Sequence, residues 1–436
     1  MIFFSAFLLV ECWLCNLILQ PTMHTDAVFV SYGLLLLNSM IFLMCLFNAN
    51  HDDDWKRLNS ILFFSFILRM GILLFDVLGR SYYVLPNSEG DAMGYHLTAI
   101  SYAFGRRHSL IALTDYAFYI GQLYQMIGVQ KITAQFINVC LSMYSIVFVY
   151  KAACLVNIKF EYRKTLVALL CFLPNFLLID SILLQEAFVS FCISVSLYLY
   201  AKWWVKNSFI DLLTAVGVSL VGAVLHIGGA VCAIGFAVTM IFVSNKSRTF
   251  RITANSFILA LVMLFSLLLI SSYWGNTLFR KLGGEVSAEV IVEKAGATDR
   301  ISNAEYDVGI AGLPPAVDLI VNSPIRMFYF ICSPVPWMWR GISDLIAFWG
   351  STIFYIATVI ATTKYVLLKI PEDEDHSLQS FARVLAVVLL IATIMFGWGV
   401  SNMGTALRHR EKFTALCALL YVVAKQGSSQ ISKRKI

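Results

Sequence analysis

Polar and ionisable residues gather at four places in this 436-residue chain, each beside long apolar runs. The first is the motif Gly90-Asp-Ala-Met-Gly-Tyr-His96. A carboxylate held near an imidazole could act as a general base on a hydroxyl, so Asp91 and His96 are candidate catalytic residues. Tyr95, between them, is a candidate substrate contact. Asp is also a common helix N-cap, and that structural role for Asp91 stays open.

The second place is Ser401–Arg410, which ends in Arg408, His409 and Arg410. Arg is charged at every relevant pH, and its planar fork of donors matches phosphate oxygens. These three side chains are therefore predicted to bind a lipid diphosphate. Contact with ordinary lipid headgroups is the alternative interpretation.

The third place runs from Arg326 to Arg340, two arginines that bracket Trp337 and Trp339. The two indole rings could form a stacking platform for a sugar, with the arginines as further substrate contacts. They could equally anchor the chain at a membrane interface, where Trp is enriched.

The fourth place is Asp180 to Glu186, at the adjoining ends of two apolar runs. Ionisable groups at membrane depth are costly, so they tend to face a cavity or a partner. Glu186 is therefore a third candidate catalytic residue.

The composition indicates the kind of protein that holds these polar residues in place. Hydrophobic residues make up 59% of the chain and charged residues 13%, about half the charged share of an average soluble domain. Such a chain lacks the polar surface of a soluble globule, and a net charge of +6 does not indicate nucleic-acid binding.

A helix that crosses a bilayer needs about 20 mostly apolar residues, and twelve runs approach that length. They are Phe3–Leu19, Ala27–Phe47, Leu58–Leu78, Ile132–Val156, Thr165–Ile179, Leu184–Ala201, Leu212–Leu225, Ile227–Ser244, Ile252–Ile270, Ile342–Thr363, Ala382–Val400 and Phe413–Ala424. The predicted fold is an all-α polytopic integral membrane protein, with residues 1–436 as a single transmembrane domain. Cys12 and Cys15 lie inside the first run, where a structural role is expected.

Lys and Arg recur in alternate loops, which predicts that both termini are cytoplasmic. Two long segments, about 80–131 and 273–341, then lie outside. Both mix polar stretches with aromatic, apolar ones, a pattern typical of helices that lie along the membrane interface. The four polar clusters gather on this external side.

Three motifs together resemble those of Wzy-type polymerases of O-antigen and capsular polysaccharide repeat units. The broader likeness is to GT-C-like membrane glycosyltransferases that use polyprenyl-linked sugars. The motifs are Gly90-Asp91…Tyr95-His96, Leu184-Gln-Glu186-Ala and Asn402-Met-Gly-Thr…Arg408-His409-Arg410.

The resemblance implies glycosyl transfer from an undecaprenyl-diphosphate-linked oligosaccharide on the outer face of the bacterial cytoplasmic membrane. Asp91, or alternatively Glu186, would assist deprotonation of the acceptor. Arg408 and Arg410, with Arg326 or Arg340, would stabilise the departing diphosphate. No cofactor and no metal are implied, and membrane lipids and chain-length regulator or flippase proteins are the expected partners.

Two alternatives remain open. A tailoring transferase would add a single sugar by the same donor chemistry. A lipid-linked oligosaccharide flippase would belong to the transporters, which often contain internal repeats and midplane sites. This sequence shows no repeat, and its polar clusters gather at one surface, which favours an interfacial enzyme.

Overall fold

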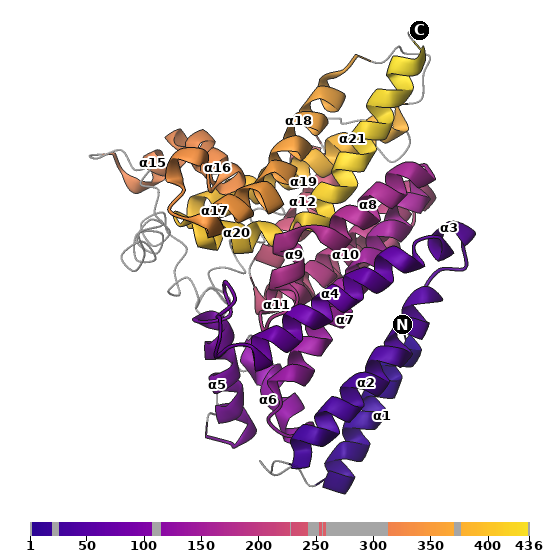
Figure 1. Cartoon of the computed structure of the whole chain (residues 1–436). Coiled ribbons are helices and arrows are strands. Elements are labelled where there is room, and N and C mark those ends of the chain that lie inside the picture. Colours follow the sequence, from indigo (N-terminus) through magenta and orange to yellow (C-terminus); the bar gives the residue numbers. More distant parts are fainter. Residues whose placement is uncertain are drawn as a thin grey trace.

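The computed structural model describes residues 2–19, 26–106, 115–226, 228–242, 253–254, 256–258, 313–369 and 376–434. Every regular element within these ranges is a helix (Figure 1), so the predicted all-α fold is confirmed there. Most of the expected span Ile252–Ile270 and most of the segment 273–341 lie outside the described residues.

The first half of the chain contains both long apolar helices and short ones. Their bounds are α1 Ile2–Leu19, α2 Asp26–Phe47, α3 Asp53–Lys56, α4 Asn59–Leu78, α5 Asp91–Ala103, α6 Tyr116–Ile127, α7 Lys131–Leu155, α8 Phe160–Phe172, α9 Pro174–Ile179, α10 Glu186–Lys206, α11 Phe209–Leu225 and α12 Gly228–Phe242. The central helix α7 packs against α10 and also contacts α2, α4 and α8.

The second half begins with short helices, and its later helices are longer apart from Met403–Glu411. Their bounds are α15 Pro315–Val321, α16 Ser323–Cys332, the 3₁₀ turn Pro336–Met338, α17 Ile342–Ala347, the π-helical turn Phe348–Thr352, α18 Ile353–Leu367, α19 Ser377–Gly399, α20 Met403–Glu411 and α21 Thr414–Arg434. The short helix α20 contacts α9, α10 and α16.

Five helices in the described part are long and apolar enough to cross a membrane, where the sequence predicted twelve spans. They are Asn59–Leu78, Lys131–Leu155, Glu186–Lys206, Ile342–Leu367 and Ser377–Gly399. Four shorter apolar helices, Ile2–Cys15, Tyr32–Phe47, Phe209–Leu225 and Gly228–Thr239, coincide with other predicted runs. These helices indicate a membrane protein.

Two predicted runs differ clearly from the helices that the structure contains. The run Thr165–Ile179 is divided at Pro174, because proline has no N–H to donate and forces Leu173 into an extended conformation. The run Phe413–Ala424 forms the first half of α21, which continues without a break through the polar tail to Arg434.

The polar segment 80–131 contributes two helices, α5 and α6, which pack against each other and lie side by side (Figure 1). They approach closely at Gly121, where an added Cβ would lie 2.7 Å from the Cβ of Tyr102 and 2.9 Å from the carbonyl oxygen of Ala99. This contact fixes α5, and therefore the start of α5 at Asp91, relative to α6.

Candidate functional site

Charged side chains from three helices meet where α20 passes the first turns of α5 and α10. Arg408 forms ion pairs with Asp91 at the start of α5 and, at 3.0 Å between Nε and Oε1, with Glu186 at the start of α10. Lys412 donates to the same Glu186 oxygen at 3.1 Å and to His409 Nδ1 at 2.8 Å. We call these five residues the three-helix charge cluster.

Local sequence explains how α20 presents its charges. Asn402 caps the helix, since its side-chain oxygen accepts from the N–H groups of Gly404 and Thr405. Residues four apart lie one above the other on a helix, so Arg408 and Lys412 share a face. Both therefore reach Glu186.

The cluster runs from a solvent-exposed end to a buried one. The side chain of Asp91 is 55% exposed and that of Arg408 is 19% exposed, whereas Glu186 is 1% exposed and Lys412 is fully buried. The second carboxylate oxygen of Glu186 has no hydrogen-bond partner within the described ranges. A ligand could therefore reach Asp91 and Arg408 first.

The electrostatic surroundings determine the protonation of the basic groups. Burial acts to lower the pKa of Arg408, but the Glu186 and Asp91 carboxylates outweigh it and the pKa is raised. The pKa of His409 is well below its usual value because of burial and the positive charges of Lys412 and Arg408. Its imidazole is therefore neutral, and Nδ1 can accept from the Lys412 ammonium.

A pair of buried acids, Asp180 and Glu411, lies behind the cluster. The carboxyl groups of Asp180 and Glu411 lie within hydrogen-bonding range of each other, and the Ser142 hydroxyl lies within range of Asp180. Burial raises the pKa of Asp180 to about 6. The pKa of Glu411 is raised well above its usual value by burial and by the charge of Asp180. We infer that this pair retains a proton near neutral pH.

Arg410 points away from the three-helix charge cluster. It is almost fully buried and donates to the backbone carbonyls of Ile331 and Ser333, at the end of α16. Its guanidinium carbon lies 5.1 Å from the ring centroid of Tyr355. Although the sequence placed Arg410 beside Arg408 as a substrate contact, its observed contacts attach α20 to α16 and α18.

The candidate arginines of the third sequence cluster have acidic partners of their own. Arg326 is buried and pairs with Asp318 at 3.1 Å, and Arg340 pairs with Asp344 at 3.1 Å. Neither forms an ion pair with the three-helix charge cluster in the described part of the chain. The structure therefore does not bring these two predicted substrate contacts together with Arg408.

The two predicted sugar-stacking residues also occupy different environments. Trp337 is 70% exposed. Trp339 donates to the carbonyl of Pro334 at 3.2 Å and packs edge-on against Phe348. Their rings do not form one continuous platform, because only Trp337 presents a largely free surface.

The aromatic and imidazole side chains of the first motif face different ways. Tyr95 packs edge-on against Tyr116, and burial together with the nearby charge of Glu186 raises its pKa. His96 instead shares a hydrogen bond of 2.8 Å with the hydroxyl of Tyr124 on α6. Burial, together with the charges of Lys131 and Arg80, lowers the pKa of His96. Its Nδ1 is therefore engaged with α6 and not with Asp91.

A second polar network, which sequence analysis did not identify, holds the loop before Asp91. Asp76 near the end of α4 accepts from Lys131 at 2.7 Å, from Gln135 at 2.6 Å and from the hydroxyl of Ser88. The N-cap of α5 is Gly90, so Asp91 lies in the first turn and does not cap the helix. These hydrogen bonds thus attach the loop that precedes Asp91 to α4 and α7.

Sequence analysis also missed Lys412 and Glu411. The signal was present, because residues 408–412 are five consecutive ionisable residues between two apolar runs. Chemically, the arrangement can hold an anion at Arg408 and accept a proton at Asp91. No set of three or more His, Cys, Asp or Glu side chains in the described ranges is arranged to hold a metal ion.

Comparisons with protein-family models, curated proteins and solved structures found no match for this chain.

Proposed function

We propose that this protein is a membrane glycosyltransferase that takes sugars from an undecaprenyl-diphosphate-linked donor at the external face of the cytoplasmic membrane. The observation that supports the proposal is the position of Arg408. It lies at the accessible end of the three-helix charge cluster, between the half-exposed Asp91 and the buried Glu186. A side chain that can bind an anion, Arg408, thereby lies next to one that can accept a proton, Asp91. Glycosyl transfer to a hydroxyl requires both groups at one site.

In this reaction the oxygen of the acceptor hydroxyl bonds to the anomeric carbon of the donor sugar. The bond from that carbon to the diphosphate breaks, and the lipid diphosphate leaves with the electron pair. Asp91 takes the hydroxyl proton. Arg408 stabilises the negative charge that develops on the diphosphate, since a charged donor aimed at developing charge lowers the barrier.

The two partners of Arg408 have separate roles in the proposal. Asp91 is exposed, so a diphosphate oxygen can replace it on the guanidinium and release its carboxylate to act as the base. Glu186 is fully buried and is also held by Lys412. It therefore keeps the guanidinium in position while the exposed contact is exchanged. Glu186 is a positioning residue in this scheme.

The specific reaction we propose is polymerisation of oligosaccharide repeat units of a surface polysaccharide. The test is a lipid-linked glycan profile of cells that lack the protein, complemented with the wild type, with Arg408→Ala or with Arg106→Ala. Arg106 is an exposed arginine outside the cluster and serves as the matched control. Each variant is compared at equal protein level in the membrane.

The expected result is that single repeat units accumulate on undecaprenyl diphosphate and long polymer disappears in the deletion strain. Wild type and Arg106→Ala restore polymer, and Arg408→Ala does not. Loss of one substituent with unchanged polymer length would instead identify a tailoring transferase. An unchanged glycan profile would refute glycosyl transfer by this protein.

A further inference from the structure

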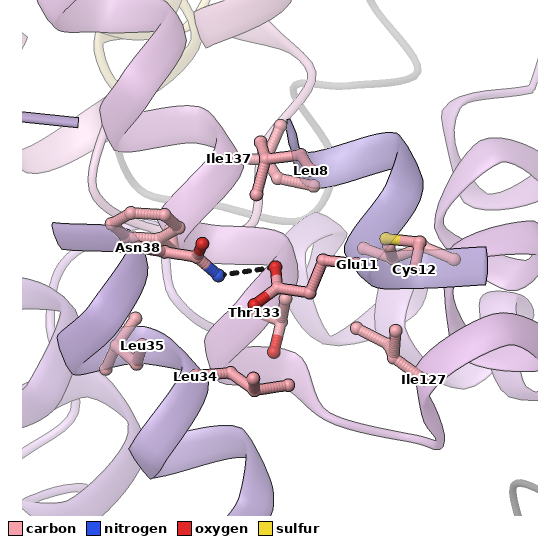
Figure 2. A pocket seen from close by; sticks show the side chains of 11 residues that line it. Leu8, Glu11, Cys12, Leu34, Leu35, Asn38, Ile127, Thr133 and Ile137 are labelled. Carbon is pink, nitrogen blue, oxygen red and sulfur yellow. Dashed lines mark hydrogen bonds between the residues drawn. The ribbon is translucent and has the colours of Figure 1, made fainter. Parts of the chain in front are cut away.

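A small cavity lies between α1, α2, α6 and α7 (Figure 2). None of its lining residues belongs to the three-helix charge cluster. It has a volume of about 40 Å³, room for on the order of three water molecules. Most of its wall is apolar, formed by leucine, isoleucine and phenylalanine side chains. Three polar side chains face it from three helices: Glu11 of α1, Asn38 of α2 and Thr133 of α7.

Glu11 and Asn38 bind each other but leave one acceptor each unused. The amide nitrogen of Asn38 donates to one carboxylate oxygen of Glu11 at 2.7 Å (Figure 2). The other Glu11 oxygen and the Asn38 amide oxygen are buried and have no hydrogen-bond partner in the part of the chain described. Asn38 is only 4% exposed. The cavity thus contains two unsatisfied oxygens, both of which require a donor or a cation.

The charge of Glu11 is also uncompensated. No Lys, Arg or His lines the cavity, and Glu11 takes part in no ion pair in the ranges given above. Cys12 and Cys15 are the titratable side chains that face the carboxyl group, and neither can supply a positive charge. An ionised carboxylate between apolar helices is strongly disfavoured when no positive charge is near it. One positive charge would remove that cost.

We propose that this cavity is an exchangeable site for a monovalent cation, either a proton or sodium, bound by Glu11 and Asn38. Sodium takes carboxylate, amide and hydroxyl oxygens as ligands, and Thr133 adds a hydroxyl to the same space. A proton on Glu11 would neutralise the carboxylate and could be shared with water in the cavity. The site is separate from the proposed glycosyl transfer and does not depend on it.

The test is labelling of the full-length protein in lipid nanodiscs with dicyclohexylcarbodiimide, which reacts with protonated carboxyl groups in apolar surroundings. The labelled peptide is identified by mass spectrometry across pH 5.5–8.5, with sodium chloride or choline chloride at equal ionic strength. We expect Glu11 to be labelled, with labelling increasing at least fivefold toward acid pH. Glu11→Gln should lose this labelled peptide and keep the label on other buried carboxyls.

The two cations give different results. If sodium suppresses the labelling at constant pH and choline does not, the site binds sodium; if only pH changes the labelling, it binds a proton. Asn38→Leu keeps the size of the side chain and should weaken sodium protection at least tenfold while leaving Glu11 reactive. Glu11 that remains unlabelled at every pH in a folded protein, or labelling independent of both pH and sodium, would overturn the proposal.

Discussion

Arg408 contacts both carboxylates of the three-helix charge cluster through different nitrogens, Nη1 toward Asp91 and Nε toward Glu186. A lysine keeps the charge but has a single nitrogen, so it cannot maintain both contacts and bind a diphosphate. We therefore expect Arg408→Lys to reduce turnover by roughly 10²-fold, comparable to the loss of one preorganised donor. The measurement is polymer formation by purified protein from lipid-linked repeat units.

The control for that substitution is a measurement of thermal stability, which shows whether the variant is folded. The melting temperature of Arg408→Lys should stay close to that of the wild type, because the positive charge beside Glu186 is retained. Full activity of the lysine variant would show that turnover does not depend on contacts through two nitrogens of Arg408.

The buried acids make the stability of the fold depend on pH. Burial raises the pKa of Asp180 from 3.8 to about 6, so the folded protein retains a proton that the unfolded chain releases. That contribution is complete below about pH 4 and is lost as the pH rises through about 6. Asp180→Asn removes this titration and should flatten the decrease in melting temperature over that interval.

Asp53→Asn is the matched control for the pH experiment, because the Asp53 side chain is 86% exposed. Its pH dependence should equal that of the wild type. An Asp180→Asn profile as steep as the wild-type profile would show that the buried pair does not retain a proton.

At the scale of elements, the position of Asp91 depends on the contact between α5 and α6. Gly121→Ala would place a methyl group against Tyr102 and Ala99. We expect a loss of roughly 1–3 kcal/mol of stability, typical of overpacking, together with reduced activity as α5 shifts. Thermal unfolding and transfer assays measure the two effects.

Gly217 on α11 is the matched control for Gly121, since a Cβ there would meet no atom within 4 Å. Gly217→Ala should be neutral or stabilising by up to about 1 kcal/mol, because alanine favours helix. Equal effects of the two substitutions would show that close contact with α5 is unimportant.

Element boundaries were less predictable than element type. Hydropathy correctly indicated helices at the predicted apolar runs that the structure describes, because apolar composition is local information. Apolarity alone could not show that Pro174 divides one run, because that break follows from the backbone geometry of proline. It also could not show that α21 extends through polar residues to Arg434. The pairing of α5 with α6 likewise depends on a close contact at a single glycine.

At the scale of the whole molecule, the charge cluster and the tail of α21 are predicted to face opposite sides of the membrane. Tyr82, beyond the end of α4, is 90% exposed, and Lys425 is exposed on α21. A membrane-impermeant maleimide should label Tyr82→Cys in intact cells. It should label Lys425→Cys only after the membrane is disrupted, each compared with the parent chain. The reverse pattern would invert the predicted orientation.

The sequence by itself determined the helical class, the apolar character of the long helices and the chemical types in the site. These properties follow from composition and short-range spacing. It identified Asp91, Glu186 and Arg408 as separate candidates, in three segments far apart along the chain.

Only the tertiary structure decided that these three side chains meet, that Lys412 joins them, and that Arg410 turns toward α16. The physical reason is the angle between successive side chains around the helix axis. Neighbouring residues on a helix point about 100° apart, so the direction of each side chain depends on which face of α20 is packed. That packing involves α9, α10 and α16, and no local pattern in residues 403–411 predicts it.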